Sequence, residues 1–307
     1  MRTRFLFAAA AATGLSLLAA CSSGGSDNSS NSPGGSMPDT SMPGPSASSS
    51  MPGMGMSGQT STSDMPGMTM PAGNGLNATV NGYTLTVHQT PTSGLPMPIT
   101  FTITKNGKAV TAFDPEQTKL MHLYLIRSDL TGFQHLHPAM AADGTWSATP
   151  ATVVTGSYRV YVQFLPHADA KVGALVLSRP FTVTGNPAPT APMPMPSDRG
   201  TVDGYTVTVV GMPKAGTETP LKITISKAGV PVTDLQPYLD TYAHVTAIHA
   251  GDLAFAHLHP NGTASGAHGG PTLTVNADLP AAGTYRMFVQ FQTGGVLHTA
   301  ALTISAG

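Results

Sequence analysis

One segment of the chain occurs twice. Residues 82–87, GYTLTV, return as residues 204–209, GYTVTV, and the same shift of 122 positions carries the peptide HLHP from residues 135–138 to residues 257–260. Self-similarity at a fixed distance is typical of repeated structural units, so we expect one domain present in two copies. We expect the first copy at residues 77–185 and the second at residues 198–307, joined by a proline-rich linker at residues 186–197.

Both copies alternate apolar and polar residues in short runs. Residues 83–87, YTLTV, 99–103, ITFTI, and 158–162, YRVYV, show this period of two, which predicts half-buried strands. The 34 glycines and 27 prolines disfavour helix and suit strands joined by turns. About seven short strands per copy predict an all-β fold of two tandem immunoglobulin-like β-sandwiches.

The charge balance excludes one class of function. The chain has 14 Lys and Arg against 15 Asp and Glu, which gives a formal net charge of −1. A protein that binds nucleic acid needs a basic surface, which this composition does not supply. We therefore expect no nucleic-acid partner.

The first 21 residues read as an export signal. Arg2 and Arg4 precede an apolar run, so residues 1–20 are expected to be a signal peptide. The run ends in Leu-Ala-Ala-Cys at residues 18–21, which resembles the lipobox of bacterial lipoproteins. The resemblance implies that Cys21 is lipidated and anchors the chain to the outer face of the cell membrane, or to the outer membrane where one exists. The alternative is a soluble secreted protein whose one cysteine stands at the cleavage site. Because no other cysteine exists, metal ligands in the folded part are limited to nitrogen, oxygen and thioether sulfur.

Residues 21–76 are rich in Met, Pro, Gly and Ser, and we expect them to form a disordered tether. Eight of the 16 methionines lie there, and similar Met-Pro-Gly-Met stretches occur in exported bacterial copper-handling proteins. Three thioethers within six residues suit Cu(I) or Ag(I) and no hard cation. The alternatives are a low-complexity spacer and methionines that absorb oxidant. The candidate soft-metal ligands are Met51, Met54, Met56, Met65, Met68 and Met70.

The most informative segment of the first copy is a predicted hairpin at residues 120–138. His135 and His137 are two residues apart on one strand, so both project from the same face. If residue 126 pairs with residue 133, His122 lies directly opposite His137. Three imidazoles then converge on one point, and the second copy repeats them at the same spacing. The candidate metal ligands are His122, His135, His137, His244, His257 and His259.

Three imidazoles are a normal set of ligands for copper, with zinc as the alternative ion. The segment resembles exported bacterial HLHP domains associated with heavy metals and copper, which implies the same chemistry. The competing interpretation is structural, with imidazole hydrogen bonds that shape the end of a strand. Five further histidines are weaker candidates, at positions 88, 167, 249, 268 and 298.

Catalytic motifs are missing from the sequence. There is no phosphate-binding glycine loop, no His-Glu-x-x-His run and no Gly-x-Ser-x-Gly elbow. The sequence therefore predicts a surface-anchored metal-binding lipoprotein that is not an enzyme, serving copper sequestration or resistance. The alternative is a non-catalytic adhesion or scaffold lipoprotein that binds another envelope protein, and a copper-dependent oxidoreductase is a minor third interpretation.

Overall fold

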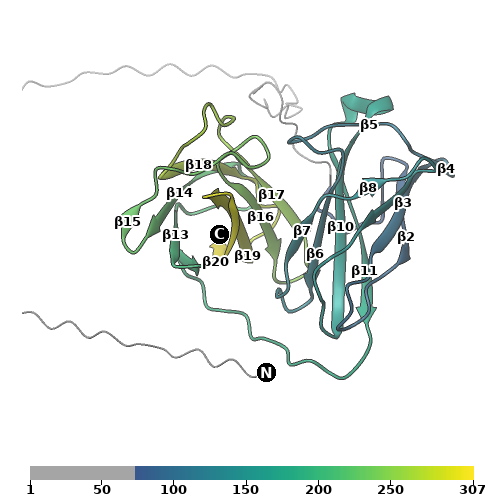
Figure 1. Cartoon of the computed structure of the whole chain (residues 1–307), viewed down its shortest axis with the longest axis horizontal. Helices are drawn as coiled ribbons and strands as arrows, with labels where there is room; N and C mark the ends of the chain where they lie inside the picture. The colour runs from purple at the N-terminus through teal and green to yellow at the C-terminus, as the bar shows by residue number, and fades with distance from the viewer. Residues whose placement is uncertain (1–72) are drawn as a thin grey trace, which may run out of the picture. The chain divides into compact units, whose positions relative to one another are not determined.

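The computed structural model describes residues 73–307, which belong to one compact unit (Figure 1). The expected signal peptide, the Cys21 anchor and the tether methionines lie outside the described residues. Within the described part, no helix is long and apolar enough to cross a membrane.

The first copy is a sandwich of two antiparallel sheets. One sheet has the order β1-β2-β3-β9-β8, with β4 added to β3, and the other has the order β11-β10-β6-β7, with β5 added to β10. A 3₁₀ helix, η1 (His167–Val172), follows β10. The strands are β1 (Thr79–Val80), β2 (Tyr83–Gln89), β3 (Ile99–Lys105), β4 (Lys108–Ala109), β5 (Phe113–Asp114), β6 (His122–Arg127), β7 (Gln134–Leu136), β8 (Ala139–Met140), β9 (Thr145–Ala148), β10 (Gly156–Pro166) and β11 (Leu175–Val183).

The second copy begins after the linker and repeats this order of strands. Here β17 pairs with both β16 and β18, so the strands form one continuous sheet, β12-β13-β14-β18-β17-β16-β19-β20, with β15 added to β14. The strands are β12 (Arg199–Val202), β13 (Tyr205–Val210), β14 (Thr219–Lys227), β15 (Val230–Pro231), β16 (His244–His249), β17 (Phe255–Pro260), β18 (Thr272–Ala277), β19 (Gly283–Thr293) and β20 (Val296–Ala306).

Each copy has its own apolar core, built by the alternation seen in the sequence. In β2 and β3, the side chains of Tyr83, Leu85, Phe101 and Ile103 are buried, whereas the intervening threonines face outward in part. Trp146 packs between Phe101 and the rest of the first core, with its ring stacked 6.4 Å from that of Phe101. The expected fold, an all-β chain of two tandem sandwiches, is confirmed.

A third apolar cluster contains residues from both copies. It joins the outer faces of the two sheets that carry the histidine hairpins, and the rings of Phe133 and Phe288 stack there with centroids 4.0 Å apart. The Tyr161 hydroxyl donates to the backbone oxygen of Leu253 at 2.5 Å. The two copies therefore contact each other through the strand faces on which the candidate ligands lie. The buried members of this cluster are Tyr124, Ile126, Leu130, Tyr161, Val176, Ile248, Phe255 and Phe288.

Candidate metal centre

The β6–β7 hairpin has the register that the sequence predicted. Leu123 pairs with Leu136 and Tyr124 pairs with His135, so the same register places His122 opposite His137, one residue beyond the end of β7. Leu123 and Leu136 belong to the core of the first copy. The three histidines therefore lie on the opposite face of the hairpin, as strand alternation requires.

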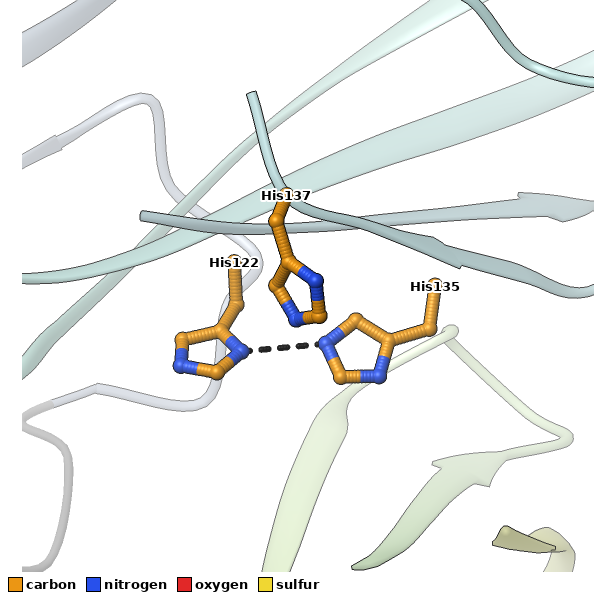
Figure 2. A group of neighbouring side chains, drawn as sticks. All are labelled: His122, His135 and His137. Atoms are coloured by element: carbon orange, nitrogen blue, oxygen red, sulfur yellow. Dashed lines mark hydrogen bonds between the residues drawn. The ribbon is translucent and has the colours of Figure 1, made fainter. Parts of the chain in front are cut away.

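The three imidazoles come together at one point (Figure 2). Ligand nitrogens of His122, His135 and His137 all lie within 4.8 Å of one another. The closest pair is Nδ1 of His122 and Nε2 of His135, which are 3.0 Å apart. The pair is at hydrogen-bond distance, drawn dashed in Figure 2. Two nitrogens bound to one ion at about 2.0–2.1 Å from it are also separated by roughly 3 Å, so the spacing fits two ligands as well.

In His122 and His135, one ring nitrogen faces the cluster and the other, the outer nitrogen, faces away from it. The hydrogen bond at each outer nitrogen decides whether the inward nitrogen carries a lone pair. Nε2 of His122 donates to the backbone oxygen of Glu116 at 3.0 Å, because a carbonyl oxygen can only accept. Nδ1 of His135 donates to Oε1 of Gln290 at 2.7 Å for the same reason. In neutral rings the two facing nitrogens then both lack a proton. This tautomer assignment follows from the hydrogen-bond network, with the Gln290 amide oriented so that its other end donates to Thr299.

The third ring supplies a further unpaired nitrogen. Nε2 of His137 is buried and has no hydrogen-bond partner within the described residues. Its ring centroid lies 5.1 Å from that of His122 and 4.8 Å from that of His135. A buried polar atom without a partner is costly, and a shared ion would satisfy all three inward nitrogens at once.

Burial keeps the three rings neutral, which is the form that binds metal. It lowers the pKa of His122 to about 4, and it lowers the pKa of His137 to about 4. It also lowers the pKa of His135 well below its usual value, with a further contribution from the neighbouring His122. No proton has to be removed from the cluster at neutral pH before an ion binds.

The second copy repeats the hairpin register but places its histidines differently. Val245 pairs with Leu258, so His244 lies opposite His259. The ring of His244 stacks on His135 of the first copy, with centroids 4.7 Å apart, and its Nε2 is hydrogen-bonded to the Tyr124 hydroxyl at 3.2 Å. His244 thus lies beside the first cluster. His259 is buried on β17, and burial lowers its pKa to about 4. The side chain of His257 is not among those described.

The five weaker candidates do not join this cluster. Four of them form hydrogen bonds with neighbouring polar side chains, which accounts for their presence without an ion. Their partners are Thr102 for His88, Asp114 for His167, Asp252 for His249, and Asp203 with Thr293 for His298.

Sequence reasoning did not find Glu116, Tyr124 or Gln290. Glu116 contributes only a backbone oxygen, which no sequence pattern identifies. Gln290 had a detectable signal, because a glutamine stands at the same position of the matching peptides YRVYVQF and YRMFVQF, between two apolar residues in each. A polar residue kept at such a position in both copies suggests a specific partner.

The fold and the cluster define a class of protein: a tandem pair of immunoglobulin-like sandwiches with a partly buried three-histidine cluster next to the contact between them. A family model matches residues 78–184 and again 200–307, and its description is "Domain of unknown function (DUF8832)". The chain belongs to this family, with the domain present twice. No curated protein matches the chain.

Solved structures give distant matches. Domains 4 and 5 of the S-layer protein SbsC match with 15% identity over 73% of this chain and 96% of that chain, at a TM-score of 0.23. A putative membrane-anchored protein from Corynebacterium diphtheriae matches with 11% identity over 74% of this chain and 59% of that chain, at a TM-score of 0.22. The chain spans 28% of the longer SbsC structure, which covers domains 1–6. Similarity at this level carries no argument about function.

Proposed function

We propose that this protein is a metal-binding lipoprotein of the bacterial cell envelope that sequesters copper, with zinc as the alternative ion. The observation that carries the proposal is the facing pair of lone-pair nitrogens in His122 and His135, with the buried, partnerless Nε2 of His137 beside them. Each outer nitrogen of the facing pair is held by an oxygen acceptor. Such acceptors are typical around imidazoles that bind metal, because they fix the tautomer that ligation needs.

The choice of copper rests on the ligand types of the whole chain. Imidazole suits both Cu(II) and Zn(II), whereas thioethers suit Cu(I). Copper can bind to both sets of ligands, as Cu(II) at the histidine cluster and as Cu(I) at the tether methionines of residues 51–56 and 65–70. The lipobox at residues 18–21 would hold the cluster and the tether at the cell envelope, where a sequestering protein binds the metal before it enters the cytoplasm.

The test is metal content of the full chain after loading and dialysis. Zn(II) is the first probe, because the tether thioethers do not compete for it. We expect His135→Gln combined with His137→Gln to remove the ion held by the first copy. The matched control is His88→Gln combined with His167→Gln, since both of those rings bond to polar side chains away from the cluster. Equal zinc content in the parent and in the His135/His137 variant would contradict the proposal and leave the scaffold interpretation.

A further inference from the structure

The three-histidine cluster of the first copy is completed by residues of the second. The amide oxygen of Gln290, on β19 of the second copy, accepts the proton on Nδ1 of His135. The ring of His244, on β16 of the second copy, stacks on His135 and is hydrogen-bonded to the Tyr124 hydroxyl of the first copy. His135 is thus a residue of the first copy whose protonation pattern and orientation depend on the second.

This dependence has a direct chemical consequence for the ligand atom. Without an acceptor at Nδ1, the proton of a neutral imidazole is free to move to Nε2. Nε2 of His135 is the nitrogen that faces His122 at 3.0 Å, so a proton there would form a hydrogen bond to Nδ1 of His122 and block ligation. Gln290 therefore keeps the ligand nitrogen available only while the two copies are in contact.

Apolar residues on the same two sheet faces stabilise the contact between the copies that places Gln290 beside His135. The Phe133 and Phe288 rings stack, and Phe288 lies on β19, the strand that carries Gln290. The first residues of the linker contact the first copy, where Arg127 donates to the backbone oxygens of Ala188 and Pro189. Further on, Met195 is 83% exposed.

We propose that the metal ion acts as a clamp between the two copies, because its binding and the contact between the sandwiches favour each other. The inference rests on the proposed function, since it requires an ion at His122, His135 and His137. Gln290 is a positioning residue in this scheme and contacts no metal. By linkage, the factor by which the contact raises metal affinity equals the factor by which metal strengthens the contact.

Gln290 is tested in the intact chain through zinc affinity. Gln290→Leu keeps the approximate size of the side chain and removes the acceptor, and it is expected to lower zinc affinity about tenfold or more. Gln290→Glu restores an acceptor for Nδ1 and is expected to restore the affinity. A purely structural role for Gln290 would not produce this rescue. Zinc affinity of Gln290→Leu equal to that of the parent would overturn the proposal.

The clamp itself is tested by cutting the linker. A protease site inserted after Met195 allows the folded full chain to be cleaved, and the dissociation constant between the two pieces is then measured with zinc and with a chelator. Phe288→Ala serves as a weakened background if the pieces stay together too tightly to measure. We expect zinc to lower the dissociation constant about tenfold or more in the parent. It should have no effect in the His135→Gln, His137→Gln variant.

The outcomes separate the clamp from the metal site. A dissociation constant that zinc leaves unchanged, although zinc remains bound to the first piece, overturns the clamp and leaves the proposed function standing. Absence of zinc from the uncut parent would overturn the proposed function and the clamp together.

Discussion

Nδ1 of His122 and Nε2 of His135 lie 3.0 Å apart, and with both rings neutral neither atom carries a proton. In this tautomer both lone pairs point at the same space, so a cation placed between the two nitrogens binds both rings without a change in their protonation.

The first prediction concerns stability with and without metal. Because the ion binds only the native state, zinc at about 100 times its dissociation constant should stabilise the parent by about 2.7 kcal/mol. His135→Gln should abolish this gain, and its amide N–H can donate to Nδ1 of His122, which limits the loss of stability in the apo protein. Thermal unfolding with zinc and with a chelator measures both effects. A loss of about 1–3 kcal/mol in the apo variant, with no effect of zinc on the parent, would instead indicate structural histidines.

The pH dependence follows from the lowered pKa values of the buried histidines. His122, His137 and His259 each have a pKa of about 4 in the folded protein, against 6.5 for an ordinary histidine. Between these values the unfolded chain binds more protons at these three histidines, so their contribution to stability is complete above pH 6.5 and is lost as the pH drops toward 4. Burial raises the pKa of the Glu116 carboxyl to about 7, and this one group opposes part of the loss because it is protonated in the folded state first. Unfolding temperatures measured in a chelator from pH 7 to pH 4 should show this decline. A flat profile across this window would contradict the burial of the three rings.

The lowered pKa values also set the pH at which protons compete with a metal ion for the histidines. An ordinary exposed imidazole would lose its metal as the pH falls below about 6.5. Here proton competition at His122 and His137 begins only near pH 4. Zinc titrations at pH 7, 6 and 5 should therefore give similar affinities, and a steep loss at pH 6 would mean that the rings are solvated in solution.

The sequence predicted the strands and the hairpin register because both depend on local pattern. Alternation fixes which residues face the core, and a one-residue slip would turn Leu123, Leu125 and Leu136 together away from the core of the first copy. The burial of the histidines depends instead on contact between two segments far apart in the chain, such as His135 and Gln290, and no local rule specifies such a pair. The sequence nevertheless contained an indication that this sheet is covered on both faces. Every residue of β6, HLYLIR, is buried, and a strand that is apolar at consecutive positions is typical of a sheet covered on both faces.

The tether prediction concerns soft-metal chemistry at residues outside the described part. Replacing the six methionines of residues 51–56 and 65–70 by Leu keeps the apolar volume and removes the thioethers. We expect a peptide of residues 21–76 with these changes to lose Cu(I) binding, measured by competition with a Cu(I) chelator. The full-chain variant should keep its Zn(II) content, since imidazoles are unaffected. Unchanged Cu(I) affinity in the peptide would leave only the spacer role.

The anchor prediction concerns Cys21. Cys21→Ser removes the thiol that the lipobox resemblance implies is lipidated, while the apolar run of residues 5–20 remains intact for export. We expect the variant to move from the membrane fraction to the soluble exported fraction when cells are fractionated. Cys21→Ser protein that stays in the membrane fraction would show that another part of the chain holds it there.

The last prediction concerns how many ions each chain holds. The second hairpin has the same register as the first, so positions 244 and 259 face each other as 122 and 137 do, and residue 257 takes the register position of His135. The repeat therefore predicts a second ion in the second copy, although within the described residues only the first set of histidines is close enough to share one. Two equivalents of zinc per full chain are the expected result.

Two double variants assign these equivalents. His135→Gln with His137→Gln should remove one, and His257→Gln with His259→Gln should remove the other, with metal content measured after dialysis. Because His244 stacks on His135, the second variant leaves that contact untouched and should not lower the affinity of the first site. A single equivalent that only the first double variant abolishes would confine metal binding to the first copy. The histidines of the second copy would then serve the contact between the sandwiches, as the hydrogen bond between Tyr124 and His244 already does.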